Sequence, residues 1–438
     1  MQEILFGYKL TPTTWAYISA LMMIGTYFKF QRFWSVRNLD LVGLICFSPG
    51  LLLIYYGLAK QDSNLIRAGY MALFVVGGCF LVRLLVDPIM VRRPLLEPNL
   101  SAGGLTFTGV SLLVFMMANV ITHQPEHSPE RSPERLESLL AKQEAPALPN
   151  PGYALFYRFA GFSNEAIIPV DKSQPDAARM ALIRASTTRT VAILAHLAIV
   201  ACLIWIGFRH FGNIHTGVAA ATLYLLTFYT SQMTSQVDHV VPAMLLVWAA
   251  AVYRRPMAAG VLLGSAAGMI YYPLYLLPLW CGFYWRRGLI RFSLGVTLAL
   301  ALLALSLALT SPNAQAFTAQ IQQMFGWRNP LDVVPSGFWQ YYEPAFRIPV
   351  VAAFVVLCAG LALWPAQKNY GTLLSCSAAV MLGTQFWHAH LGGLYMAWYL
   401  PLLILTIFRP NLEDRVAPSA VRDVWIPWRR IASTRSPL

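Results

Sequence analysis

The chain has 438 residues, of which 57% are hydrophobic and only 12% charged, and it carries a formal net charge of +13. Soluble globular proteins contain roughly 25% charged and about 45–50% apolar residues, so this composition excludes an ordinary soluble domain. Continuous apolar runs long enough to cross a hydrocarbon layer recur along the sequence, and they exclude a β-barrel, whose strands alternate. The sequence therefore predicts an all-α, polytopic membrane helix bundle.

The predicted bundle has about 12–13 membrane segments, with one broken helix pair and two long outer loops. We predict spans, in chain order, at 12–29, 40–58, 66–86, 104–121, 190–208, 215–231, 238–253, 258–284, 291–311, 348–365, 371–387 and 392–408. The predicted units are an N-terminal four-span unit (1–121), an extracytoplasmic loop (122–189), central spans (190–311), a second extracytoplasmic loop (312–347), C-terminal spans (348–408) and a basic tail (409–438).

The basic residues conflict with a simple count of these spans. With twelve spans, the basic clusters fall on both sides of the membrane. One side then holds Lys29/Arg32/Arg37, Arg92/Arg93 and Arg254/Arg255, and the other holds Arg286/Arg287/Arg291 and the tail. The positive-inside rule expects these clusters to share one side of the membrane.

A broken helix removes this conflict. A single helix over 258–284, about 27 residues, would be roughly 40 Å long, and prolines at 273 and 278 interrupt it. We therefore predict that the chain turns near Tyr271-Tyr272-Pro273, which places the whole basic excess on the cytoplasmic side. The N-terminus is then outside and the C-terminus inside a cytoplasmic membrane. Because broken helices are tolerated where they line a cavity, we expect a site near this turn.

The two long loops differ in composition. The first begins with a Pro- and Glu-rich part, 123–152, which we predict to be a disordered tether, and continues with an apolar, aromatic part, 153–189, which we predict to be ordered. The second opens with Phe317, Ile321 and Met324 on one helix face, which predicts a helix lying in the membrane interface.

The most informative block covers residues 234–291. It contains Gln236-Val-Asp238, an apolar span, Arg254-Arg255, three glycines at 260, 264 and 268, Tyr271-Tyr272-Pro273 and Arg286-Arg287. The glycines are four residues apart, so they share one helix face and permit close approach of a neighbouring helix.

The order and spacing of these elements resemble the polyprenol-phosphate-mannose-dependent mannosyltransferases of the GT-C superfamily of membrane glycosyltransferases. The chain departs from the family at Ser235, where the family has glycine, and at Ile270, where it has lysine. A lysine at that depth suits a lipid phosphate, so its replacement favours a non-catalytic GT-C-like scaffold as one alternative.

The resemblance implies an enzyme, a hexosyltransferase. It would transfer a sugar, mannose in the family, from a polyprenyl-phosphate donor to an acceptor hydroxyl at the outer face, with inversion. The phosphate leaves without protonation, so one carboxylate acting as general base suffices. The expected partners are this donor and membrane lipids, with no nucleic acid and no cofactor; the sequence leaves a divalent metal and the oligomeric state open.

Three acids are candidates for the base. Asp171 is the first choice, because it and Glu165 lie in an apolar segment of the first long loop, although a solvated loop acid fits equally well. Asp238 lies where a span enters the membrane, and an unpaired carboxylate there is unfavourable, which favours a functional role or a pair with Arg189 or His239.

The candidate substrate-binding residues are polar or aromatic groups near the outer face. Aromatic faces pack on sugar rings and arginine binds phosphate, although the same residue types also anchor proteins at membrane interfaces. His388-Ala-His390 has metal-ligand spacing but no acid or cysteine beside it, so we predict a polar cavity lining and no metal. The candidates are Gln236, Tyr271, Tyr272, Trp327, Arg328, Trp339, Tyr341, Glu343, His388 and His390.

A transporter or flippase for a lipid or polar solute is the second alternative, because broken helices also mark transport sites. Ion-coupled transport requires ionisable residues within the spans. Arg83 is the main residue of this kind, near a predicted cytoplasmic end.

Overall fold

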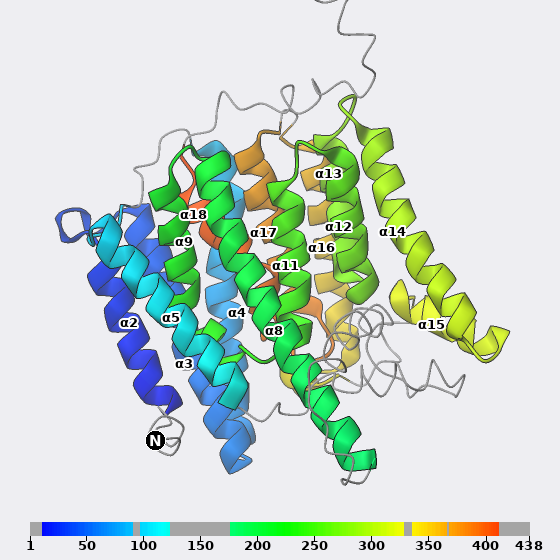
Figure 1. The fold of residues 1–438 in the computed structure, drawn as a ribbon, viewed down its shortest axis with the longest axis horizontal. Helices are drawn as coiled ribbons and strands as arrows, with labels where there is room; N and C mark the ends of the chain where they lie inside the picture. Colours follow the sequence, from blue (N-terminus) through cyan, green and yellow to red (C-terminus); the bar gives the residue numbers. More distant parts are fainter. Residues whose placement is uncertain (1–10, 91–96, 123–175, 328–334, 366–367, 411–438) are drawn as a thin grey trace, which may run out of the picture.

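The structure, a computed structural model, describes residues 11–90, 97–122, 176–327, 335–365 and 368–410. The secondary structure elements in these residues are all helices, which confirms the predicted all-α bundle. The helices run between two faces of the molecule, and the short helix α15 lies across the end of the bundle (Figure 1).

The α-helices of the first half are α2 (Pro12–Tyr27), α3 (Val36–Lys60), α4 (Ser63–Val86), α5 (Ala102–Thr122), α8 (Asp176–Arg209), α9 (Ile214–Leu226), α10 (Phe228–Gln232) and α11 (Val237–Ala251). Those of the second half are α12 (Pro256–Met269), α13 (Leu277–Phe283), α14 (Leu289–Thr310), α15 (Ala314–Met324), α16 (Arg347–Leu363), α17 (Tyr370–Trp387) and α18 (Leu400–Phe408). Short 3-10 turns include η2 (Asp87–Ile89), η3 (Tyr272–Leu276) and η6 (Met396–Trp398).

Polar side chains define where many of these helices begin. A side-chain oxygen at the N-cap accepts a hydrogen bond from a backbone N–H of the first turn and so satisfies a donor that the helix leaves unpaired. The caps of α2, α3, α4, α9, α15 and α17 are Thr11, Ser35, Asp62, Asn213, Asn313 and Asn369.

In the described part of the chain, six helices are long and apolar enough to cross a membrane. They are α3, α4, α5, the 185–209 part of α8, α14 and α16. The apolar helices α9, α11 and α12 are shorter. These lengths and compositions support a polytopic membrane protein.

The predicted broken helix is present. α12 ends at Met269, η3 follows, and α13 returns towards the start of α12 (Figure 1). At the end of α13, the hydroxyl of Tyr284 donates a hydrogen bond of 2.5 Å to the carbonyl of Tyr253, just before α12. Because of this reversal, α12 and α14 begin on the same face and run parallel.

The glycines of α12 pack against α14, as their spacing predicted. A Cβ added at Gly260 would lie 2.2 Å from the carbonyl oxygen of Phe292, and one at Gly264 would lie 2.9 Å from that of Val296. A Cβ at Gly268 would meet Leu303. The absence of side chains thus lets the two helices approach at backbone distance.

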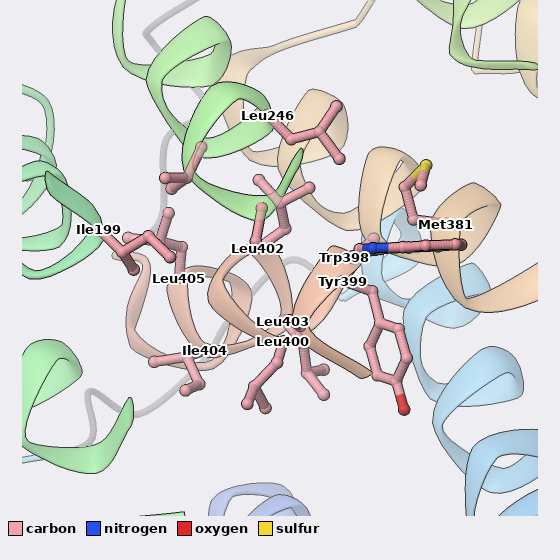
Figure 2. Close-up of a cluster of buried hydrophobic side chains, with 14 of the residues drawn as sticks. Ile199, Leu246, Met381, Trp398, Tyr399, Leu400, Leu402, Leu403, Ile404 and Leu405 are labelled. Atoms are coloured by element: carbon pink, nitrogen blue, oxygen red, sulfur yellow. The ribbon is translucent and has the colours of Figure 1, made fainter. Parts of the chain in front are cut away.

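The centre of the bundle is formed by α17 and α18. All 9 residues of α18 are buried, and Figure 2 shows its leucines surrounded by side chains of other helices. α17 is buried along its length except at Phe386. The elements leading into and out of α17 therefore have positions fixed by tight packing.

Two faces of the bundle differ in charge. We call the face at the top of Figure 1 the basic face; the α2–α3, α11–α12 and α13–α14 turns lie there with Arg32, Arg255 and Arg286. The described members of the predicted cytoplasmic clusters thus share one face. We call the opposite face, at which the chain turns between α12 and α13, the site face.

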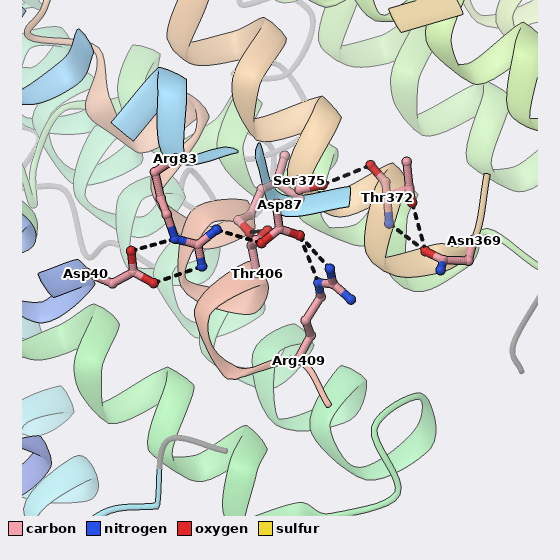
Figure 3. Close-up of polar contacts among 9 residues, drawn as sticks. Asp40, Arg83, Asp87, Asn369, Thr372, Ser375, Thr406 and Arg409 are labelled. Carbon is pink, nitrogen blue, oxygen red and sulfur yellow. Dashed lines mark hydrogen bonds and ion pairs between the residues drawn. The ribbon is translucent and has the colours of Figure 1, made fainter. Parts of the chain in front are cut away.

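A buried ionic network ties three elements together at the basic face (Figure 3). Arg83 in α4 donates to both carboxylate oxygens of Asp40 in α3, at 2.9 and 3.0 Å, and to Asp87 at 2.8 Å. Arg409, just after α18, also donates to Asp87. Arg83 thus lies at the basic end of its helix, where the sequence placed it.

Three predicted boundaries differ from the structure. α8 begins at Asp176, well inside the predicted outer loop, and Glu165 and Asp171 lie outside the described residues. The span predicted at 215–231 is broken at Thr227, whose backbone is extended. In the span predicted at 392–408, only η6 and α18 are helical.

Candidate functional site

The segment between α17 and α18 is largely non-helical and enters the site face of the bundle. A buried amide holds it there, since Gln385 accepts hydrogen bonds from the backbone N–H groups of Gly393 (3.2 Å) and Tyr395 (3.3 Å). Ser336 pairs with the same segment through backbone bonds to Ala389 and Leu391. These bonds fix the side chains that the segment carries.

Rings from four parts of the chain meet beside this segment. The ring centroids of Tyr395 lie 4.5 Å from those of both His239 and Trp398, and those of Tyr272 and His388 are 4.7 Å apart. We call this group the aromatic–histidine cluster. Its members are Tyr229, His239, Tyr272, His388, Tyr395 and Trp398.

Asp238 lies at the edge of this cluster, in the first turn of α11. Its Oδ2 is 3.8 Å from Nε2 of His239, one of the two partners that the sequence suggested. Nδ1 of His239 is 2.6 Å from the hydroxyl of Tyr229, and Trp398 donates from Nε1 to the backbone carbonyl of Asp238. The residue therefore lies against polar and aromatic groups of the cluster.

The helix break brings two tyrosines to the same place. The hydroxyls of Tyr271 and Tyr272 are 2.7 Å apart. Gly326, after α15, has a φ of +67° and lies against the ring of Tyr271. A Cβ added at Gly326 would lie 2.7 Å from Cδ2 of that ring. Only glycine fits this close approach, which places the end of α15 beside the break.

Arg347, at the start of α16, is a site residue that the sequence analysis missed. Its side chain is buried at 3% exposure and donates from Nε (3.3 Å) and Nη2 (3.1 Å) to the carbonyl of Trp387. The guanidinium also interacts electrostatically with Tyr271 and Tyr272. It places a cation beside the break that follows Ile270. The only sequence signal was an arginine at the edge of an apolar run, where basic residues are common.

His388 follows α17 and is a neutral member of the cluster. Burial, with smaller contributions from His390 and Arg347, lowers the pKa of its imidazole to about 3. The ring stacks on Tyr272, and its Nδ1 accepts from the backbone N–H of His390. His390 itself is exposed, and its Nδ1 lies 3.4 Å from the hydroxyl of Ser336.

The structure brings some predicted residues into the cluster and leaves others outside it. Trp339 is buried elsewhere, with Nε1 donating to the carbonyl of Phe386, and the hydroxyl of Tyr341 donates to the carbonyl of Ser63. These contacts anchor the second loop to α4 and α17.

The remaining predicted residues lie around the same face. Gln236 lies just before Asp238, and its buried Oε1 has no hydrogen-bond partner among the described residues. Trp327, next to Gly326, is 72% exposed, and Glu343 is also exposed. Arg328 lies outside the described residues.

An apolar groove of about 430 Å³ is lined by residues of η3, α13 and α16. The ring of Tyr275 lines its end and contacts Trp387, whose carbonyl accepts from Arg347. The lining residues of α16, between 355 and 363, lie two turns or more along the helix from Arg347. The lining of the groove is Tyr275, Pro278, Val355, Cys358, Ala359, Ala362 and Leu363.

Neither a comparison with models of protein families nor a search of curated proteins found a match for this chain. The function must therefore be argued from the geometry of the site.

Proposed function

We propose that the chain is an integral-membrane glycosyltransferase that takes a sugar from a polyprenyl-phosphate donor and transfers it to an acceptor hydroxyl. One observation carries the proposal: the buried guanidinium of Arg347 interacts electrostatically with Tyr271 and Tyr272, and Trp387, which it contacts, packs on Tyr275 of an apolar groove. A cation with two hydroxyl donors suits a phosphate, and the groove suits its hydrocarbon chain.

The donor phosphate would lie against Arg347, with its polyprenyl chain along α16. Guanidinium binds phosphate oxygens through two parallel hydrogen bonds, and it stays charged when the site excludes water. In this role Arg347 replaces the lysine whose position Ile270 occupies in the resemblance to GT-C enzymes.

The aromatic–histidine cluster offers ring faces for the sugar, and Asp238 at its edge is the proposed general base. The acceptor hydroxyl gives its proton to the Asp238 carboxylate while its oxygen forms the new bond to the anomeric carbon. The bond from that carbon to the phosphate oxygen breaks, and its electron pair leaves with the phosphate. Attack opposite the leaving phosphate inverts the anomeric configuration.

We further propose that the basic face is cytoplasmic, following the positive-inside rule. The protein then lies in a cytoplasmic membrane with its N-terminus outside and its C-terminus inside. The site face opens to the outer side, where a lipid-linked donor supplies an activated sugar without a soluble nucleotide.

Transfer of radiolabelled mannose from polyprenyl phosphate in isolated membranes tests the proposal. We expect R347Q to lower transfer about 100-fold, through loss of the phosphate-binding cation, and D238N to lower it at least about 100-fold, through loss of the base. R67Q removes the same charge from an exposed position on the site face, so we expect it to retain activity.

Two results separate the alternatives. Loss of transfer in D171N but not in D238N would move the role of base to Asp171 and leave the proposed reaction intact. Absence of transfer with every polyprenyl-linked sugar supplied would overturn the proposed enzyme, and lipid translocation by the same protein would then identify a flippase.

A further inference from the structure

Two turns meet at one corner of the basic face. One joins α11 to α12 and the other joins α13 to α14, and the Tyr284–Tyr253 hydrogen bond connects them. A Cβ added at Gly288 would lie 2.8 Å from Cγ of Pro256. This hydrogen bond and the contact of Gly288 with the ring of Pro256 keep the two turns close together.

These turns carry a concentration of arginines, which we call the basic corner: Arg254, Arg255, Arg286, Arg287 and Arg291. Three of them, Arg255, Arg286 and Arg291, are exposed. Within the described chain, none of the five forms an ion pair, in contrast to Arg83 and Arg409 nearby on the same face. Uncompensated positive charge at this density is a binding surface for an anion.

Apolar side chains beside these arginines indicate what kind of anion fits. Trp285 lies in the α13–α14 turn and is 61% exposed, and Ile290 at the start of α14 is 77% exposed. Exposed tryptophan is typical of the headgroup level of a bilayer. The basic corner therefore fits an anion that also carries hydrocarbon, namely a membrane phospholipid.

We propose that the basic corner binds a phospholipid with two phosphates, one held by each turn. Arg254 and Arg255 lie on one turn, and Arg286 and Arg287 lie on the other. Because guanidinium groups bind phosphate oxygens bidentately, each pair suits one phosphate. A lipid with a single phosphate leaves one pair without a partner. This inference does not depend on the proposed transferase activity.

Binding of diphosphatidylglycerol to the purified full-length protein, measured by native mass spectrometry, tests the proposal. R255Q/R286Q removes one exposed arginine from each turn, and we expect about 30-fold weaker binding. The control R32Q/R209Q removes two exposed arginines from elsewhere on the basic face, so binding should be unchanged. The single variants R255Q and R286Q should each show part of the loss.

Phosphatidylglycerol at equal total charge and soluble pyrophosphate complete the experiment. We expect both to bind at least about tenfold more weakly than diphosphatidylglycerol. Equal losses in the two double variants, or equal binding of the two lipids, would show a general effect of surface charge and overturn the site. Equally tight binding of pyrophosphate would also overturn it, because the ligand would then be a soluble diphosphate.

Discussion

Buried arginines at the two faces have different surroundings. Arg83 and Arg409 share the carboxylate of Asp87, which is fully buried, so these arginines form ion pairs with an acid. At the site face, Arg347 donates to the main-chain carbonyl of Trp387 and interacts electrostatically with Tyr271 and Tyr272. The first arrangement pairs buried charges of opposite sign, and the second places a guanidinium among main-chain and aromatic groups at the site face.

The ionic network gives a prediction about stability. Asp87→Asn removes the shared negative charge and leaves the buried guanidinium of Arg409 facing a neutral amide, while Arg83 keeps its hydrogen bonds to Asp40. We therefore expect a loss of about 3 kcal/mol in the free energy of unfolding. Denaturant titration of the protein in detergent, followed by tryptophan fluorescence, measures the change.

Glu97→Gln is the matched control, because it removes an exposed carboxylate from the same face. We expect the control to stay within about 0.5 kcal/mol of the parent. Equal stability of D87N and E97Q would mean that the network contributes no net stabilisation.

At the scale of elements, the parallel packing of α12 on α14 depends on glycine. A methyl group at Gly260 would lie 2.2 Å from the backbone oxygen of Phe292, and a backbone atom cannot move aside as a flexible side chain does. We therefore expect Gly260→Ala to destabilise the bundle by about 1–3 kcal/mol, measured as above.

Gly360 in α16 provides the control for this substitution, because nothing lies within 4 Å of an added Cβ. We expect Gly360→Ala to be neutral, or stabilising by up to about 1 kcal/mol, because alanine favours the helix. If both variants lose stability equally, glycine content rather than the α12–α14 contact is responsible.

The segment between α17 and α18 should open when its internal bonds are removed. Gln385→Ala takes away the acceptor of the backbone N–H groups of Gly393 and Tyr395. At about 1 kcal/mol for each bond, amide exchange at these two residues should rise about 30-fold, as measured by hydrogen–deuterium exchange. Gln322→Ala, an exposed position in α15, should leave their exchange unchanged.

Some elements could be predicted from sequence and others could not, for physical reasons. The break after Met269 has a local cause in Pro273, and the distribution of arginines independently requires it. The extended segment before α18 has no comparable local signal, because the buried amide of Gln385 stabilises it through tertiary contacts. Its apolar composition therefore predicts one span over 392–408, although only the last part of this run is an α-helix.

The candidate site shows the same division. Asp238, Tyr271 and Tyr272 belong to a recognisable block; Tyr272 is part of the aromatic–histidine cluster, Asp238 lies at its edge, and Tyr271 bonds to Tyr272. Arg347 was missed because it lies in a different helix, and only the fold places it beside Tyr271. Trp339 was grouped with substrate-binding aromatics by composition, whereas its indole N–H bonds to the backbone of α17.

At the scale of the whole molecule, the separation of charge between the two faces determines the expected orientation. The basic face holds exposed arginines at several turns, and this asymmetry orients membrane proteins with the basic side in the cytoplasm. The proposed active site and the proposed phospholipid site then lie on opposite sides of the membrane. A sugar transferred at the first would remain outside the cell.

Cysteine labelling measures this orientation directly. In a protein whose six native cysteines are replaced by alanine, Asn64→Cys places an exposed thiol on the site face and Gln31→Cys places one on the basic face. A membrane-impermeant maleimide added to intact spheroplasts should label N64C and not Q31C, and inside-out vesicles should give the reverse. Labelling of Q31C alone in spheroplasts would invert the orientation and move the proposed transfer reaction to the cytoplasmic side. If both thiols are labelled only after detergent treatment, neither face is accessible in spheroplasts or vesicles. This result would exclude a location in the plasma membrane.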